Sequence, residues 1–174
     1  RTKKGPLPTW DSKTWEEWAE VRHTAKPETE AVWIDGTFVQ DCLAWLQEGP
    51  GLLWYEFDGL ARELLRRAKD AGQSVSFVGP GAEGDERIRQ LSGSESCCIS
   101  IRAHGTGKNL QQFNRNLGAN PPASGAEWEQ LLGRTHRQGQ EADEVTFDVY
   151  RHTEPFVNSI ERARDLSEYI GDTF

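Results

Sequence analysis

The stretch Ala103–Gln111, AHGTGKNLQ, brings together residue types that bind phosphate. Its glycines, threonine and lysine have the composition of a P-loop, in which a glycine-rich backbone cradles a nucleotide. A P-loop also needs a glycine five positions before its Gly-Lys pair and a serine or threonine after it, whose hydroxyl reaches Mg²⁺. These two positions hold Arg102 and Asn109. The stretch is therefore not read as a P-loop, which argues against a small P-loop kinase.

A second polar cluster, Gln130–Gln140, reads QLLGRTHRQGQ and concentrates Arg134, His136 and Arg137 where a helix is expected to end. Two arginines three residues apart project from neighbouring positions of a helical turn. The guanidinium group is the side chain best suited to bind a phosphate at two points. The cluster fits an arginine finger. The alternative is an exposed basic helix end that interacts favourably with the helix dipole.

Apolar periodicity predicts the elements that position these clusters. Helices are expected at 36–47, at 58–71 with Asp58 as N-cap, near 85–91 and at 126–135. Short apolar or alternating runs predict strands at 52–57, 74–78, 97–103, 113–117 and 144–152. Thr153 is expected to cap a final helix whose buried stripe consists of Val157, Ile160, Ala163, Leu166 and Ile170.

The alternation of strands and helices predicts an α/β fold, with a mainly parallel sheet covered by helices on both faces. Ligands of such folds bind outside the carboxyl ends of the strands. The stretch AHGTGKNLQ follows the strand expected at 97–103 directly, and it is therefore a candidate site.

Two parts are expected along the chain. Residues 1–30 are predicted to form an N-terminal arm with a short helix near Ser12–Val21, and residues 31–174 to form the globular domain. The arm carries Trp10, Trp15 and Trp18, and packing on the domain or on a missing neighbour is favoured over base stacking. The chain lacks methionine and begins at Arg1, so we expect it to be an excised piece of a longer protein.

Composition narrows the classes of partner. The net charge of −8 argues against a surface that attracts nucleic acid everywhere, although it permits a local basic track. No apolar run approaches the roughly 20 residues of a membrane span. Cys42, Cys97 and Cys98 are expected to be buried thiols in a reducing cytoplasm. The histidines have no metal-ligand spacing, so no structural metal is expected.

Together the two clusters resemble motifs V and VI of superfamily 2 helicases, specifically of the second RecA-like lobe in the Swi/Snf-related branch. Motif V has two glycines around a variable residue and then one residue before Asn-Leu, which matches Gly105, Gly107, Asn109 and Leu110. Motif VI follows Gln-x-x-Gly-Arg-x-x-Arg, which matches Gln130, Gly133, Arg134 and Arg137. The Gln138-Gly139-Gln140 extension also resembles sequences of this branch. The residues NLQQFN and EQLLGRTHRQGQ are most similar to those of bacteriophage helicases.

The resemblance covers roughly residues 33–170 and has two departures. The family usually carries an Asp-x-x-Trp-Asn-Pro-like segment between the motifs, where this chain has LGANPPASG at Leu117–Gly125. Lys108 replaces the more usual leucine before Asn-Leu and adds a charge that could contact a phosphate.

The resemblance implies a three-layer RecA-like domain that shares an ATP site with a first lobe. That first lobe would supply the P-loop lysine and the acidic pair that binds Mg²⁺, so this lobe alone is expected to bind no cofactor and to be inactive. The implied catalytic residues are Arg137 and Arg134. The implied ATP-binding residues are Gln130, Gly133, Gly107 and Asn109. The implied nucleic-acid-binding residues are Gly105, Thr106, Lys108 and His104, with a loop-orienting role as the alternative for His104.

The expected function is thus that of a motor lobe of an ATP-dependent DNA helicase or translocase in the cytoplasm of a bacterium or a phage-infected cell. Its expected partners are the first RecA-like lobe and DNA, with RNA left open and no membrane. The alternative is a non-catalytic nucleic-acid- or protein-binding module that keeps the RecA-like fold.

Overall fold

The computed structural model describes residues 12–25, 32–120, 122 and 124–171, with side chains described except at 12, 164 and 166–171. The chain divides into two units, Arg1–Trp33 and Ile34–Phe174. In the first unit, helix α1 spans Ser12–Val21, as predicted. The rings of Trp15 and Trp18 contact each other on this helix, at 5.1 Å between centroids. Trp10 lies outside the described residues, and the packing of the arm stays a prediction.

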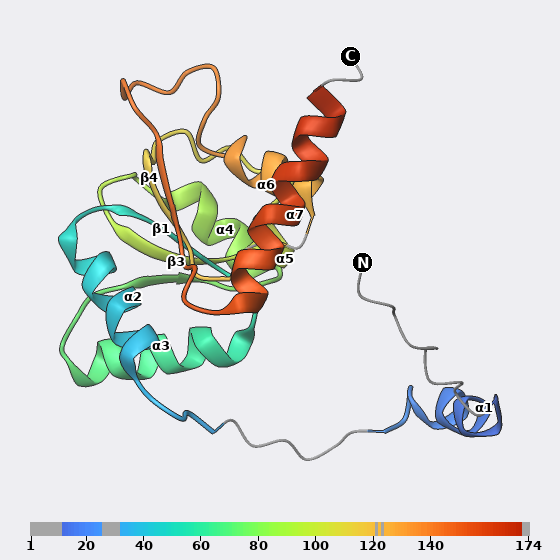
Figure 1. Cartoon of the computed structure of the whole chain (residues 1–174). Coiled ribbons are helices and arrows are strands. Elements are labelled where there is room, and N and C mark those ends of the chain that lie inside the picture. Colours follow the sequence, from blue (N-terminus) through green and yellow to red (C-terminus); the bar gives the residue numbers. More distant parts are fainter. Residues whose placement is uncertain (1–11, 26–31, 121, 123, 172–174) are drawn as a thin grey trace. The chain divides into compact units, whose positions relative to one another are not determined.

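The second unit is built on a five-stranded, all-parallel sheet with strand order β2-β3-β1-β4-β5 (Figure 1). The strands are β1 (Gly51–Tyr55), β2 (Ser76–Val78), β3 (Ser96–Ser100), β4 (Arg115–Gly118) and β5 (Thr146–Val149). The helices are α2 (Thr37–Glu48), α3 (Asp58–Asp70), α4 (Ala82–Gln90), α5 (Ile101–His104), α6 (Gly125–Leu132) and α7 (Glu154–Gly171). The predicted α/β class and parallel sheet are confirmed.

Helices cover both faces of the sheet because the central strand is apolar throughout. Leu53 and Tyr55 of β1 pack with α2 and α3, whereas Leu52 and Trp54 pack with α4 and α6 on the opposite face. Figure 1 shows α2 and α3 on one side of the strands and α4 and α6 on the other. Helix α7 packs against α6, and its Ala163 is buried as predicted. The expected burial of Leu166 and Ile170 falls outside the described side chains.

The cysteines are free and buried, as predicted. Burial raises the pKa of the Cys42 and Cys97 thiols to about 12 and that of Cys98 well above its ordinary value. These thiols are therefore protonated and unreactive in the folded chain. Within the described residues, no helix is long and apolar enough to cross a membrane.

The predicted ends of several elements were wrong. Asp58 is the first residue of α3, whose N-cap is Phe57, and no side-chain cap bond forms there. The strand predicted to reach Ala103 stops at Ser100, whose hydroxyl accepts a bond from the Ala103 N–H and starts α5. A short helical turn therefore separates β3 from the glycine-rich stretch.

Helix α3 carries a buried carboxylate that its own arginines neutralise. Glu63 accepts hydrogen bonds from Arg66 (Nη2 to Oε1, 2.7 Å) and from Arg67 (Nε to Oε1, 2.6 Å). These bonds lower the pKa of Glu63 from its ordinary 4.5 to about 2. Arg67 also donates to the Gly36 carbonyl at 3.3 Å, so this cluster ties α3 to the start of α2.

Candidate functional site

The two polar clusters of the sequence lie side by side, as two loops. The 105–110 loop follows α5 and the 133–140 loop follows α6. The guanidinium Nη1 of Arg134 donates to the Lys108 carbonyl at 3.1 Å, and the Leu110 N–H donates to the Arg134 carbonyl at 3.0 Å. The Nε of Arg134 also donates to the Gln130 carbonyl at 2.7 Å. Arg134 therefore clamps the loops together.

The 133–140 loop forms because α6 ends early. Ser124 caps the start of the helix by accepting a bond from the Glu127 N–H at 3.2 Å, but the last helical residue is Leu132. The predicted helical span to Thr135 was thus too long, and Arg134 and Arg137 lie in turns. The Arg134 N–H donates to the Leu131 carbonyl, and the Thr135 N–H donates to the Leu132 carbonyl. These two hydrogen bonds are of the 3₁₀ type and tighten the chain as it leaves the helix.

A buried polar anchor holds the 133–140 loop to the sheet. Asn116 of β4 is fully buried; its Nδ2 donates to the Thr135 hydroxyl at 3.2 Å, and its Oδ1 accepts from Trp54 Nε1 at 3.1 Å. Thr135, which lies between Arg134 and Arg137 in the sequence, is itself fully buried. The sequence interpretation missed Asn116 and Thr135, although an asparagine within a short central strand is a signal of a buried hydrogen-bond network.

A second anchor lies at the end of the same loop. The side-chain amide of Gln140 donates to the carbonyls of Phe113 at 2.9 Å and Thr135 at 3.1 Å. Its Oε1 accepts a bond from the Ala142 N–H at 3.0 Å. The sequence indicated Gln140 only as part of an extension of the motif, and the structure shows that it joins the 133–140 loop to the segment just before β4.

The two arginines of the loop have different surroundings. Arg134 is partly buried, and this burial, followed by the positive charge of Arg137, lowers the pKa of its guanidinium. Arg137 is exposed, and within the described residues its side chain makes no hydrogen bond or ion pair. Arg137 is therefore the guanidinium that is free to receive a ligand.

His104 is placed to shape the 105–110 loop. Its ring is 1% exposed, and Nε2 lies 2.7 Å from the Gly79 carbonyl. Gly84 fits against the same carbonyl, because a Cβ there would lie 1.9 Å from the Gly79 oxygen and 3.1 Å from His104 Nε2. This burial favours the loop-orienting role of His104 over a contact with nucleic acid.

The 105–110 loop begins at a buried glycine and has an exposed tip. Gly105 is buried, and a Cβ there would lie 2.5 Å from the Ile101 carbonyl. Thr106 and Gly107 are exposed, and Gly107 has a φ of 71°, a conformation that glycine adopts easily. Lys108 pairs with Asp85 of α4 at 2.6 Å, and this bond lowers the pKa of Asp85.

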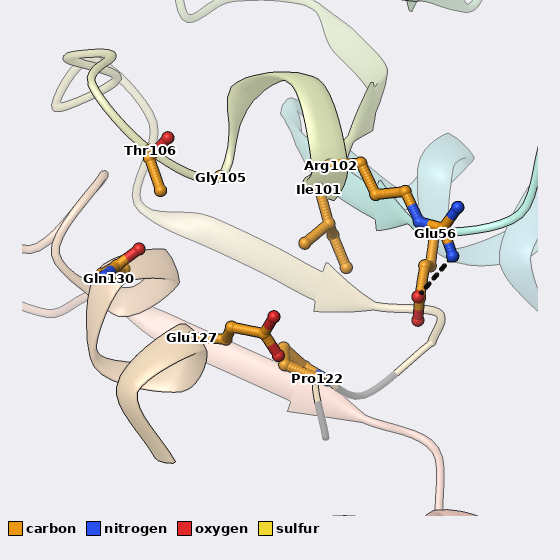
Figure 2. Close-up of a pocket in the computed structure, with 8 residues that line it drawn as sticks. All are labelled: Glu56, Ile101, Arg102, Gly105, Thr106, Pro122, Glu127 and Gln130. Carbon is orange, nitrogen blue, oxygen red and sulfur yellow. Dashed lines mark hydrogen bonds and ion pairs between the residues drawn. The ribbon is translucent and has the colours of Figure 1, made fainter. Parts of the chain in front are cut away.

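Two hollows lie beside these loops: one takes residues from the 105–110 loop and from α6, and the other takes residues from both loops. The first, the Thr106 hollow, has a volume of about 440 Å³ and lies at the carboxyl ends of β1 and β3, beside α6. Figure 2 shows its lining, with an ion pair between Arg102 and Glu56 at 3.0 Å on one side. The full lining is Glu56, Ile101, Arg102, Gly105, Thr106, Pro122, Glu127 and Gln130.

The second, the amide hollow, has a volume of about 610 Å³ and is lined by Ser92, Asn109, Gln111, Gln112, Asn114, Gly139, Gln140, Glu141 and Ala142. The predicted site residues are therefore divided. Gln130, predicted to bind ATP, shares the Thr106 hollow with Gly105 and Thr106, whereas Asn109 lines the amide hollow. Gly133 is the C-cap of α6 and lines neither. Among the described residues no group of His, Cys, Asp and Glu could hold a metal ion.

Comparisons with known proteins identify the fold. No protein-family model and no curated protein sequence matches the chain. Among solved structures, the chain is similar to the C-terminal part of the Fun30 ATPase domain, with a TM-score of 0.59 and 17% identity over 89% of this chain and 52% of that chain. It is also similar to the C-terminal domain of the DEAD-box protein Dbp5, with a TM-score of 0.59 and 17% identity over 79% of this chain and 81% of that chain.

A third similar structure is S. cerevisiae Dbp5 bound to RNA and ADP BeF3, with a TM-score of 0.57 and 15% identity over 95% of this chain and 48% of that chain. This chain thus spans about half the length of the Fun30 and RNA-bound Dbp5 structures. The likeness to these C-terminal domains and the all-parallel sheet show that the chain has the RecA-like α/β fold, as predicted.

Proposed function

We propose that this chain is the C-terminal motor lobe of an ATP-dependent DNA helicase or translocase, and that it shares a nucleotide site with a first RecA-like lobe. The observation that carries the proposal is the pairing of the two loops, in which Arg134 clamps the 105–110 loop and Arg137 stays free. An arginine finger must be held on a rigid support and yet have no partner of its own before the nucleotide arrives. The buried Asn116–Thr135 anchor supplies that support.

The residues present fit one part of an ATP site. ATP bound between the lobes would supply the phosphoryl group that is transferred to water, and Arg137 would stabilise the charge that develops on it. Among the described residues no group of three or more His, Cys, Asp or Glu side chains could hold a metal ion, and we propose that the first lobe holds Mg²⁺. Asn109 and the backbone N–H of Gly107, both exposed residues, are the proposed further contacts to the nucleotide. Gln130 is a proposed ATP contact only if the nucleotide reaches the Thr106 hollow.

Nucleic acid is proposed to contact the exposed tip of the 105–110 loop. Backbone N–H groups of a glycine-rich loop bind phosphates without a large basic surface, which is compatible with the net charge of −8. Lys108 would have to exchange Asp85 for a phosphate to take part. The choice of DNA, of the Swi/Snf-related branch and of a bacteriophage origin rests on the sequence resemblance.

The test is nucleic-acid-stimulated ATP hydrolysis by a protein that contains both lobes. Arg137→Ala should reduce turnover by about 10³-fold or more while ATP still binds, because the finger acts mainly in the transition state. The matched control is Arg62→Ala, which removes an exposed arginine from α3. Unchanged turnover in Arg137→Ala would favour the alternative, a binding module that keeps the fold without the motor.

A further inference from the structure

The buried ring of His104 has one nitrogen without a hydrogen-bond partner. Nε2 lies 2.7 Å from the Gly79 carbonyl, and because a carbonyl oxygen only accepts, Nε2 carries the hydrogen of the neutral ring. Nδ1 is then an acceptor, and it accepts no hydrogen bond within the described residues although His104 is 1% exposed. Buried polar atoms without a partner are rare and costly, so this nitrogen needs an explanation.

A carboxylate oxygen faces the same nitrogen. Oδ1 of Asp85, on α4, lies 3.7 Å from Nδ1 of His104. The same Oδ1 is paired with Nζ of Lys108 at 2.6 Å. Two acceptors therefore lie opposite each other, and the ammonium group binds one of them. A proton on Nδ1 would change this contact into an ion pair between an imidazolium and a carboxylate.

The ammonium group of Lys108 opposes the uptake of that proton. Its bond to Asp85 lowers the pKa of this carboxyl, so Asp85 is ionised near neutral pH. While Lys108 is bound, its positive charge offsets the negative charge that faces the buried ring. When the ammonium moves away, Asp85 alone faces His104 and favours the protonated ring.

The other charged groups near the ring already have partners. On α4, Arg89 is paired with Glu86. On α5, Arg102 is paired with Glu56 at 3.0 Å. The turn between β2 and α4, which meets the ring through its first carbonyl, consists of glycine and proline. The departure of Lys108 is therefore the event that changes the charge beside the ring.

Lys108 can leave Asp85 without any movement of the 105–110 loop. Its carbonyl is held by Nη1 of Arg134 at 3.1 Å, so only the flexible side chain has to turn toward the exposed tip at Thr106 and Gly107. We propose that Lys108 exchanges Asp85 for a phosphate of nucleic acid together with the uptake of one proton from water by His104. Phosphate binding and proton uptake then favour each other, because such coupling is reciprocal. That the phosphate belongs to nucleic acid rests on the proposed function.

The ring resonances of the histidines test the proton uptake without nucleic acid. Ring ¹⁵N shifts of the 174-residue chain are followed from about pH 9 to pH 5, the range in which histidines titrate. Lys108→Ala leaves Asp85 alone beside the ring, so His104 should take up its proton at higher pH than in the wild type. Asp85→Asn removes the carboxylate and should reverse this effect in the double variant. His136, exposed on the 133–140 loop, should titrate alike in every variant.

Affinity for a short oligothymidylate tests the exchange in the protein with both lobes. Lowering the pH from 8 to 6 should strengthen binding by roughly two- to fivefold more in the wild type than in His104→Gln, the factor expected for one exposed ion pair. Glutamine keeps a donor for the Gly79 carbonyl but takes up no proton. Exposed histidines also favour DNA at low pH, so the matched control is His136→Gln, which should keep the part of the pH response that depends on His104. At pH 8, Asp85→Asn should bind more tightly than the wild type, because Lys108 has lost its carboxylate.

Two results would overturn the inference. One is an equal titration of His104 in the wild type and in Lys108→Ala. The other is an equal pH response of the wild type and His104→Gln while Lys108→Ala still weakens binding; the nucleic-acid contact would then stand without its link to a proton. If the ring titrates as expected but Lys108→Ala leaves the affinity for DNA unchanged, the link among the three side chains stands and the proposed contact of Lys108 with nucleic acid falls.

Discussion

Replacing Asn116 with leucine tests whether a buried polar anchor holds the candidate site. The side chain of Asn116 is 0% exposed and makes a third hydrogen bond, from Nδ2 to the Thr146 carbonyl at 3.1 Å. It therefore joins β1, β4, the start of β5 and the 133–140 loop at one point. Leucine branches at the same atom as asparagine and is larger, so Asn116→Leu removes these bonds without leaving a cavity.

The expected decrease in the free energy of unfolding follows from the buried groups that lose their hydrogen bond to Asn116. Trp54 Nε1 and the Thr135 hydroxyl belong to side chains that are both 0% exposed, so water cannot replace Asn116 without entering the core. An unsatisfied buried polar group costs about 1–3 kcal/mol. With the Thr146 carbonyl included, and with the greater hydrophobicity of leucine offsetting part of the loss, we expect a decrease of about 3–5 kcal/mol in the free energy of unfolding. Domains of this size have about 5–15 kcal/mol in total.

The assay is urea unfolding of the 174-residue chain, followed by circular dichroism. The matched control is Asn114→Leu, the same exchange two residues earlier at an exposed position, which should change the free energy of unfolding by less than about 0.5 kcal/mol. Thr135→Val should lie between the two variants, since it removes one of the three bonds. Equal unfolding midpoints for Asn116→Leu and Asn114→Leu, at unchanged urea dependence, would refute the anchor.

Three further variants test other parts of the domain. The pKa of Glu63 is lowered to about 2, so its ion pairs stabilise the fold above about pH 4.5 and this contribution is lost as the pH falls toward 2. Glu63→Gln should therefore cost about 2 kcal/mol at pH 7 and flatten the acid limb of the stability curve, whereas an unchanged acid limb would contradict the pKa shift. Gly84→Ala should lower the stability by about 1–3 kcal/mol because its Cβ meets a backbone carbonyl, while Gly59→Ala, with open space around its Cβ, should be neutral or stabilising in thermal unfolding. In the protein with both lobes, Lys108→Ala should reduce the slope of log affinity for DNA against log salt concentration by about one, and Lys69→Ala, on α3, should leave that slope unchanged.

The elements were predictable from sequence because their signals are local. The apolar run LLWYEF and the spacing of Val39, Cys42, Leu43 and Leu46 report a strand and a helix without reference to the rest of the chain. Their ends were less predictable, because single contacts decide them. The Ser100 hydroxyl that starts α5 and the buried Thr135 that pulls the chain out of α6 act on one residue each. Neither contact changes the periodicity of the sequence.

The sequence indicated candidate site residues, which stay a prediction, but it did not indicate the residues that hold them in place. The resemblance selected Arg134 and Arg137 by their places in a motif, and the structure brings their loop next to the 105–110 loop. The supports are Asn116, whose partners are 19 to 62 residues away, and Gln140, which reaches carbonyls 5 and 27 residues away, and a single sequence does not reveal such pairs. The amide hollow was missed for the same reason, since its lining joins Asn109 of the 105–110 loop to Gly139 and Gln140 of the 133–140 loop and to residues outside both loops.

Arg134 could couple the nucleotide site to the 105–110 loop, because part of its guanidinium is already bound to that loop. Its Nε and Nη1 are committed to the carbonyls of Gln130 and Lys108, whereas its Nη2 has no partner among the described residues. If Arg134 also contacts the nucleotide, as the family resemblance implies, a phosphate at Nη2 would bind the same guanidinium that holds the Lys108 carbonyl. The Arg134 guanidinium would then link the nucleotide to the 105–110 loop, which is proposed to contact nucleic acid. Because such coupling is reciprocal in binding free energy, nucleic acid at that loop would in turn change the affinity for the nucleotide.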